Sequence, residues 1–336
     1  MDAPRHMAVI AALLGTLLSS CALPPLAEPL NGKPRIPAQA IFLNPERPGQ
    51  SRVGKLEYRA GFALSSDSPN FGGFSGLSLS PDGTRLTAVS DQGDLLRARL
   101  EVDGTGRLQG LSGAEMHRLR GVDGEPLFQG FNKRLQDAEA VERLADGSYL
   151  VSFEHRHRVL RYADLLGRPS LFATPPGIAE APANGGLEAM APLPDGRVLV
   201  LSEKYRGNEG RGDYVGWLLA ADGQSLGRVY WPGVGSFRPT DLAALPNGDV
   251  LLLQRRFSLA GGMGARLSHI PAARIKAGGR LIGQELARLV PPLSVDNFEG
   301  LAVHPDPGGG WLIYLLSDDN FNPLQRTLLL QFHLSE

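Results

Sequence analysis

The stretch "GGLEAMAPLPDGRVLVLSEKYRG", from Gly185 to Gly207, contains two short apolar runs separated by a Pro-Asp-Gly turn. Runs of this length on either side of such a turn predict two antiparallel strands joined as a hairpin. Glu188 stands at the start of the first predicted strand, and Glu203 stands at the end of the second. Because a hairpin returns the chain to the end where it began, we predict that these two carboxylates are neighbours.

The same arrangement recurs along the chain, and this repetition is the most informative feature of the sequence. "DAEAVERLADGSYLVSFEHRHR" and "RPTDLAALPNGDVLLLQRRF" keep the same interval between the bracketing residues, and two looser copies contain "GFSGLSLSPDG" and "DNFEGLAVHPDPGGG". Five hairpins are therefore predicted. The residues that bracket them are Ser75 and Asp91, Glu139 and Glu154, Glu188 and Glu203, Thr240 and Arg255, and Glu299 and Asp318.

Further strand-like runs follow the hairpins, such as "LLRARLEV" and "YVGWLLAAD", so each repeat predicts four strands. Repeats somewhat longer than the roughly 40 to 50 residues of a typical propeller blade predict blades with extended loops. The last repeat ends with "TLLLQFHL" and lacks a fourth strand, whereas "RVGKLEYRAGFAL" near residues 52–64 has no hairpin of its own. We predict an all-β propeller of four-stranded blades that is closed by this N-terminal strand. Five repeats are readable, and the long first unit has room for a sixth.

The composition agrees with a single globular domain. The 336 residues include 42 glycines and 26 prolines, and 42% of the chain is hydrophobic, as in a turn-rich protein with a sizeable core. Tandem blades pack into one ring, so we predict one domain over residues 52–336. The net charge of −1 supplies no field that would attract nucleic acid. We expect a monomer that does not bind nucleic acid.

The N-terminus has the pattern of an export signal. Arg5 precedes the apolar run "MAVIAALLGTLL", which is too short to span a membrane. The run is followed by "LSSC", and Cys21 is the only cysteine of the chain. This motif resembles the bacterial lipobox, in which the cysteine becomes the lipidated first residue, so we predict a lipoprotein signal over residues 1–21. The alternative is an ordinary secreted protein whose signal ends near a cysteine.

Residues 22–51 are rich in proline and weakly patterned, which predicts a tether between the lipid and the domain. Ala22 follows the cysteine where an aspartate would favour the inner membrane, and the resemblance to other lipoproteins implies the outer membrane. We therefore expect an exported protein that is anchored in the cell envelope through Cys21 and faces the periplasm.

The first strand of every propeller blade lines the central channel, so the residues at its start are predicted to converge at one mouth of that channel. Several of these residues are acidic, and like charges raise one another's pKa. A hard divalent cation with oxygen ligands, above all calcium, would compensate them. We predict Glu139, Glu188 and Glu299 as catalytic residues, and Glu139, Glu188, Glu299, Glu203 and Asp318 as metal ligands.

Basic residues follow the ends of the second predicted strands and offer another source of compensation. Guanidinium groups also bind phosphate or carboxylate through two parallel hydrogen bonds. The alternative is that the acids only cap strand ends and pair with arginines to hold the blades together. The predicted ligands of a small anionic substrate are Arg156, Lys204, Arg206, Arg255 and Arg256, and Arg158 belongs to the same group.

Other catalytic patterns are weaker. "GGFSGL" lacks the final glycine of a nucleophile elbow because Leu77 takes its place, which disfavours Ser75 as an esterase nucleophile. His155 and His157 alternate, so on a strand both would point to one face as metal ligands, as an acid and base pair, or as an anion-binding edge. His304 lies near a predicted turn and is expected to be structural. The sequence carries no phosphate-binding loop or dinucleotide fingerprint, so we expect no nucleotide cofactor.

The repeats "EAVERLADG", "EAMAPLPDG" and "PTDLAALPNGDVLLLQRRF", and above all "DNFEGLAVHPDPGGGWLIYLLSDDNFNPLQRTLLLQF", resemble the bacterial phytase-like domain family, which is described as having esterase-like activity of phytase. The resemblance covers roughly residues 52 to 334, and it implies a β-propeller of the cell envelope with a phosphoesterase type of activity.

Two functions of different classes follow. The first is a metal-assisted hydrolase of a small phosphoester, or of a lactone or other ester, in which a cation polarises the ester and arginines hold the anion. The second is a non-catalytic envelope protein whose propeller face binds a ligand or a partner, because a fold alone does not determine function.

Overall fold

The computed structural model describes residues 32–128, 134–207 and 212–335. The predicted signal over residues 1–21, with Cys21, lies outside the described residues, as does the start of the predicted tether. Within the described part of the chain, helix formation is limited to two short 3₁₀ turns at Ile178–Glu180 and Ala272–Arg274. None of the described helices has the length and apolar character that crossing a membrane requires.

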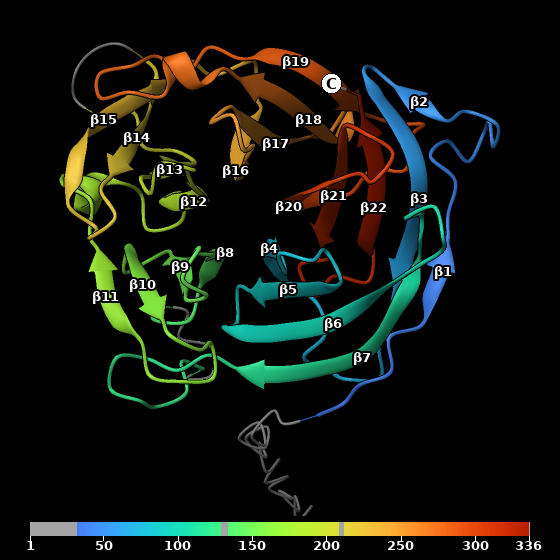
Figure 1. Ribbon diagram of the computed structural model, residues 1–336, viewed down its shortest axis with the longest axis horizontal. Coiled ribbons are helices and arrows are strands. Elements are labelled where there is room, and N and C mark those ends of the chain that lie inside the picture. The colour runs from blue at the N-terminus through green and yellow to red at the C-terminus, as the bar shows by residue number, and fades with distance from the viewer. Residues whose placement is uncertain (1–31, 129–133, 208–211, 336) are drawn as a thin grey trace, which may run out of the picture.

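The described chain forms four four-stranded antiparallel sheets and one six-stranded antiparallel sheet, each with one four-stranded blade, arranged around a central axis (Figure 1). The predicted five-bladed, all-β propeller is thus confirmed. The first blade comprises β4 (Phe74–Leu79), β5 (Arg85–Ser90), β6 (Asp94–Val102) and β7 (Leu108–Arg118), and the second comprises β8 (Ala138–Arg143), β9 (Tyr149–Phe153), β10 (Arg158–Tyr162) and β11 (Ser170–Ala173). The third comprises β12 (Leu187–Pro192), β13 (Val198–Ser202), β14 (Tyr214–Leu219) and β15 (Ser225–Trp231). The fourth comprises β16 (Arg238–Ala244), β17 (Val250–Ser258), β18 (Gly262–Ile270) and β19 (Gln284–Leu289), and the fifth comprises β20 (Asn297–Pro305), β21 (Trp311–Asp318), β22 (Thr327–Leu334) and β3 (Leu56–Leu64).

The hairpin that opens each blade forms where the turn glycines predict it. Gly147 and Gly196 adopt φ angles of 88° and 85°, in the left-handed region that glycine enters without steric cost. In the third blade the hairpin places Met190 opposite Val200. The first strands β4, β8, β12, β16 and β20 lie innermost in Figure 1. Their starts are therefore brought together around the channel.

The core lies between successive blades, which pack face to face around the ring. One apolar cluster joins Leu253 and Leu267 of the fourth blade to Phe298, Leu315 and Phe332 of the fifth, and all five are fully buried. Alternate residues of each strand point to opposite faces, so a nearly continuous apolar sequence is needed where both faces are covered. This explains the runs of leucine and valine in the second strand of each repeat.

The N-terminal strand β3 supplies the fourth strand of the fifth blade and pairs antiparallel with β22 along its whole length. A short strand, β1 (Ala38–Ala40), pairs with the other edge of β3, and β2 (Arg52–Val53) pairs with the start of β3. Ile36 and Leu43 are buried. The described part of the predicted tether over residues 22–51 is thus packed on the propeller.

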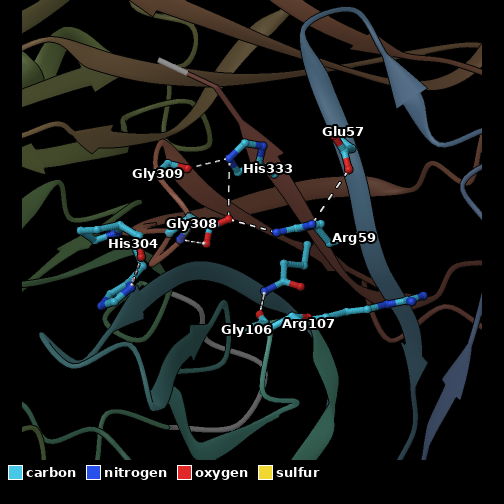
Figure 2. Close-up of polar contacts among 12 residues, drawn as sticks. Glu57, Arg59, Gly106, Arg107, His304, Gly308, Gly309 and His333 are labelled. Atoms are coloured by element: carbon cyan, nitrogen blue, oxygen red, sulfur yellow. Dashed lines mark hydrogen bonds and ion pairs between the residues drawn. The ribbon is translucent and has the colours of Figure 1, made fainter.

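A buried polar network lies in the fifth blade, where β3 pairs with β22 (Figure 2). Asp306 is 7% exposed, and its carboxylate contacts Arg59 of β3 at 3.2 Å and His333 of β22 at 3.6 Å. The same carboxylate accepts a hydrogen bond from the Gly308 amide at 2.9 Å. Asp306 therefore joins the turn after β20 to β3 and β22.

A neighbouring side chain connects the fifth blade to the first. Gln331 on β22 is fully buried, and its amide donates to the backbone oxygen of Gly106 at 2.8 Å and accepts from the Leu108 amide at 2.9 Å. Buried polar groups whose hydrogen bonds are formed in this way favour one arrangement of the two blades, because any other arrangement would leave these groups without partners.

Replacing Asp306 with alanine is expected to lower the free energy of unfolding by about 2 to 4 kcal/mol, because Arg59 and the Gly308 amide lose a buried partner. Urea denaturation measures this effect. Glu57→Ala is the matched control, since Glu57 reaches Arg59 only at 4.0 Å from an exposed position, and it should cost less than about 1 kcal/mol. Equal losses in the two variants would show that Asp306 does not stabilise this junction.

Candidate functional site at the channel mouth

A β-bulge interrupts the pairing of the first two strands in every blade, and it contains the repeat-equivalent residues that the sequence singles out. In the third blade Leu187 pairs with Ser202 and Ala189 pairs with Leu201, so Glu188 has no partner in the ladder. A bulge bends its strand and redirects the extra side chain. The corresponding interruptions leave out Ser75, Glu139, Thr240 and Glu299.

Three carboxylates converge in the second blade. One oxygen of each of Asp137, Glu139 and Glu154 lies within 4.8 Å of the others, and all three residues are buried. Glu154 Oε1 accepts hydrogen bonds from the backbone amides of Gly185, at 2.6 Å, and Gly186. These amides belong to the third blade, so the position of Glu154 is set from two sides. Converging carboxylate oxygens are the donors that a hard divalent cation prefers.

Glu188 extends this group through a hydrogen bond with Glu154. Two carboxyl groups form such a bond only when one of them carries a proton. Burial raises the pKa of Glu188 well above its ordinary value, and the carboxylates of Glu139 and Glu154 raise it further. Burial also raises the pKa of Glu139 well above its ordinary value, followed by the effects of Glu154 and Asp137. The charges that act most strongly on these two groups are all negative, so this half of the mouth favours a proton or a cation.

Arg255 on β17 compensates the other half of the mouth. Its Nε lies 2.7 Å from Glu299 Oε1 and its Nη2 lies 3.7 Å from Glu203 Oε1, so it joins the third, fourth and fifth blades through ion pairs. The Lys204 ammonium lies 2.5 Å from the second oxygen of Glu203. Burial alone would lower the pKa of Arg255, but the surrounding carboxylates raise it above its ordinary value. This half of the mouth therefore has its own positive charges.

Glu299 and Asp318 belong to the half of the mouth that Arg255 compensates. Asn297 donates to Glu299 at 2.9 Å and lies 3.4 Å from the carboxylate of Asp318. Burial raises the pKa of Glu299 while Arg255 opposes that shift. Burial raises the pKa of Asp318 well above its ordinary value, and Glu299 adds to this. Of the five predicted metal ligands, Glu139 lies in the compact carboxylate group of the second blade, and Glu188 lies beside it.

The predicted substrate-binding cations separate in the structure, because only Arg255 and Lys204 among them contact the acids. Arg206 lies over the Tyr214 ring, 4.1 Å from its centroid. Adjacent residues of a strand point to opposite faces, so Arg256 on β17 points away from the face that carries Arg255. Its guanidinium lies over the Phe237 ring, 5.5 Å from the ring centroid.

The two predicted histidines occupy the turn between β9 and β10 rather than a strand, so the expectation that they share one strand face is wrong. His155 Nε2 lies 3.1 Å from the carboxylate of Asp137, which makes it a member of the site. His157 is buried with its Nε2 3.1 Å from the Pro182 oxygen. Its ring packs so closely against Gly186 that a Cβ there would lie 2.0 Å from Nδ1. His157 therefore supports the backbone that binds Glu154.

Strained backbone marks the same mouth. Among the described residues other than glycine, positive φ angles occur at His155 (53°), Asn320 (50°) and Phe321 (49°), each just after the second strand of a blade. Such conformations cost energy and concentrate at functional sites. The Phe321 ring packs against Gly73, where a Cβ would lie 2.4 Å from it, and Phe321 is 36% exposed. The Phe321 ring thus lies beside Gly73, directly before the start of β4.

The two hydroxyl residues at the bulges bond to the backbone. Ser75 Oγ lies 3.5 Å from the Gly73 oxygen, and Thr240 Oγ1 donates to the Phe298 oxygen at 3.2 Å. β5, a strand rather than a helix, follows the Ser75 strand, so the context of a nucleophile elbow is missing there. Ser75 is accordingly a lining residue of the mouth. His304 contacts backbone oxygens at a turn, as expected.

Two residues of the site, Asp137 and Asn297, were not predicted, and they stand two positions before the bulge residues Glu139 and Glu299. A comparison of that position across the repeats would have found them. Glu142 and Asp241 were not predicted either. Burial raises the pKa of Glu142 well above its ordinary value, and Asp241 adds to the shift.

Several solved structures are similar to this chain at low identity. A putative gluconolactonase is 15% identical with a TM-score of 0.44, and the alignment covers 89% of this chain and 93% of that one. A gluconolactonase from Xanthomonas campestris is 11% identical with a TM-score of 0.42, covering 90% and 95%. Virginiamycin B lyase from Staphylococcus aureus is 10% identical with a TM-score of 0.43, covering 89% and 100%.

No curated protein shows a significant match to this sequence. The family model that describes the phytase-like proteins, with the words "esterase-like activity of phytase", matches residues 69–321. These residues include all five inner strands and every acid of the channel mouth. Because the match spans well over half of the chain, this protein belongs to the phytase-like family.

Proposed function

We propose that this phytase-like propeller is a hydrolase of a small phosphoester, lactone or other ester, and that a divalent cation, with calcium as the first candidate, is its cofactor. The observation that carries the proposal is the convergence of buried oxygens from Asp137, Glu139 and Glu154 within 4.8 Å. Burying several ionised carboxylates together without a compensating charge is costly. A cation removes that cost.

The residues fit such an ion. Calcium takes six to eight oxygen ligands and accepts mixtures of carboxylates and waters. The three carboxylates would supply part of that shell and leave positions for water and substrate. Glu154 is fixed by two backbone amides, and His155 contacts Asp137, so the ligands are held by neighbouring groups. When bound, the cation would polarise the ester oxygen and lower the pKa of a coordinated water.

Glu188 is the residue that we assign to proton transfer. Its carboxyl group is buried and hydrogen-bonded to Glu154, and burial raises its pKa well above the ordinary value, with the carboxylates of Glu139 and Glu154 adding to the shift. A carboxylic acid of this kind can donate its proton to a leaving oxygen and take one back from water. Phe321 at the rim would help to exclude water from the reacting group.

Arg255 is assigned a different role from the one that the sequence suggests. Its guanidinium is already paired with Glu299 and Glu203, so it holds three blades together rather than offering free donors to a substrate. Glu299 shares this role. The same ion pairs favour the second candidate function, a non-catalytic propeller that binds a ligand in the cell envelope. Acids that are already paired between blades are suited to a structural role.

Calorimetric titration of the chelator-treated protein with calcium tests the proposal. We expect one binding event, which Glu139→Gln weakens by at least about 100-fold because it removes a ligand charge. Glu203→Gln is the matched control, since Glu203 lies at the same mouth but is paired with Lys204 and Arg255. Glu188→Gln should retain calcium and lose hydrolysis of p-nitrophenyl phosphate, p-nitrophenyl acetate or gluconolactone, whichever the wild type cleaves.

Three outcomes are informative. Absence of binding with calcium, magnesium, manganese and zinc alike would overturn the metal mechanism. Binding without hydrolysis of any ester class would favour the ligand-binding alternative. Equal weakening by Glu139→Gln and Glu203→Gln would place the ion outside the group formed by Asp137, Glu139 and Glu154.

A further inference from the structure

A cavity of about 400 Å³ lies beside the second blade, outside the channel mouth. One wall is the connection between β7 and β8, with Val122 and Leu127. The other wall comes from the turn before β10 and from β11, with Arg156, Arg158 and Leu171. The cavity is large enough for a small organic molecule.

Arg158 is the unusual residue of this cavity. It is only 8% exposed, and its guanidinium donates to the backbone oxygens of Arg156 at 2.8 Å and Leu135 at 2.5 Å. It also lies over the Phe153 ring at 4.3 Å. No carboxylate among the described residues forms an ion pair with it. Burial lowers the pKa of Arg158 to about 10, and the neighbouring charge of Arg156 contributes to this shift.

A buried guanidinium that binds only neutral oxygens has lost its hydration without gaining a counter-charge, which is costly. The acidic residues of the cavity do not provide that charge, since Asp123 and Glu125 are exposed and neither pairs with Arg158. The missing negative charge therefore points to a ligand.

The rest of the cavity indicates what kind of ligand would fit. Arg156 is exposed next to Arg158 and supplies a second guanidinium, and paired guanidiniums suit carboxylate or phosphate. Leu171 and Val122 are 60% and 48% exposed at the cavity, which provides apolar surface beyond the cations. An anion joined to a small apolar group matches both features.

We propose that this cavity binds an organic anion, a carboxylate or a phosphate monoester, through Arg158 and Arg156, with the apolar part of the ligand against Leu171 and Val122. The site requires no metal ion, so it stands independently of the proposed hydrolase. It is nevertheless connected to the channel mouth. Leu135, which accepts from Arg158, is two residues from Asp137, and the turn that carries Arg156 begins at Glu154.

Calorimetry on the full chain, with chelator present so that the channel mouth stays free of metal, tests this proposal. The probes are phenyl phosphate, benzoate and phenol, which share a ring and differ in charge. We expect at least one of the two anions to bind with a Kd below about 1 mM, and phenol to bind at least tenfold more weakly because it offers no anionic group. Whichever of the two anions binds more tightly identifies the anionic group that the cavity prefers. Failure of both anions to bind more tightly than phenol would overturn the proposal.

Substitutions assign the binding to the cavity. Arg158→Met should weaken binding of the anion by roughly ten- to hundredfold, because it removes charge-assisted hydrogen bonds. Arg156→Ala should weaken binding several-fold. Arg156 is exposed, so this second variant should fold even if Arg158→Met does not. Arg288→Met, at an exposed arginine of the fourth blade that pairs with Glu285, is the control and should bind normally. Unchanged affinity in both cavity variants, or an equal loss in the control, would place the anion elsewhere.

Discussion

The Arg255→Met variant is expected to lose about 3 to 5 kcal/mol of unfolding free energy at pH 7.5, because it removes one partner of a buried ion-pair network and leaves Glu299 and Glu203 without that charge. Arg255 makes these contacts at 2.7 and 3.7 Å and links three blades. Methionine keeps most of the aliphatic volume, so the loss reports the charge rather than a cavity. Chemical denaturation of the metal-free protein measures it.

Arg256→Met provides the matched control for this prediction. Arg256 is the next residue on β17 and lies over the Phe237 ring instead of facing the acids. Its removal should cost about 1 kcal/mol or less, the value of a partly exposed cation–π contact. If the two substitutions cost the same, the ion pairs of Arg255 contribute little and the acids of this half are compensated in another way.

The penalty in Arg255→Met should also depend on pH. Without the guanidinium, the pKa of Glu299 rises further, because burial already raises it and Arg255 is the main opposing charge. Near pH 5 the folded variant can protonate this group and avoid an unpaired buried charge. The difference in unfolding free energy between the wild type and Arg255→Met should therefore be smaller near pH 5 than near pH 8.

Much of this fold was predictable because its signals are local. The turn glycines, such as Gly147 and Gly196, and the two apolar runs around each of them define a hairpin wherever they occur. Five copies of one hairpin then imply equivalent positions around one axis. The gathering of Glu139, Glu188 and Glu299 at one mouth follows from this repetition alone.

The pairing of charges at the mouth could not be predicted in the same way. Arg255 and Arg256 are adjacent in the sequence, and only the register of β17 decides which of them faces the acids. The bulge at Glu188 adds one residue to the strand and changes the direction of the side chain, yet no single residue type marks it. His155 and His157 form part of a turn, and the positive φ angle of His155 cannot be predicted from the pattern of apolar residues.

Arg158 shows a second limit of the sequence. A basic residue in the run "HRHR" is expected to lie in solvent, as Arg156 does, and nothing in the sequence shows that Arg158 is buried without a carboxylate. That fact depends on Leu135 and on residues of the segment 121–127, which lie more than 20 positions away in the sequence and line the same cavity as Arg158. Burial against a distant segment is a tertiary property, so such a site emerges only from the structure.

The metal-free protein is expected to lose stability as the pH rises from about 4 to 8, in contrast to proteins whose acids are stabilised as anions. Burial raises the folded-state pKa of Asp94 to about 6, above its ordinary value near 4, and raises those of Glu139, Glu188 and Asp318 well above theirs. Below the unfolded-state pKa, both states carry these protons and no penalty arises. Above it, the unfolded chain ionises while the folded chain holds its protons, so the folded state is increasingly disfavoured.

Glu188→Gln should flatten this slope and raise the melting temperature of the metal-free protein at pH 8, because it replaces a carboxyl that ionises on unfolding with an uncharged group of the same shape. When the pKa of a group is one unit higher in the folded than in the unfolded state, removing that difference changes the free energy of unfolding at high pH by about 1.4 kcal/mol. Glu46→Gln, at an exposed position, should leave the slope unchanged. Thermal unfolding monitored by circular dichroism between pH 4 and 8 compares the three proteins.

Calcium should reverse the loss of stability, and should do so most strongly at pH 8. Cation binding requires ionised carboxylates, so it competes with the protons that these groups hold at lower pH. A ligand that binds only the folded state raises the free energy of unfolding, and with it the melting temperature, by an amount that grows with the logarithm of its affinity. The shift produced by calcium should therefore grow from pH 5 to pH 8 and be largely absent in Glu139→Gln. A shift that is independent of pH would mean that calcium binds away from the acids whose pKa values are raised, and the channel mouth would then owe its charge balance to protons alone.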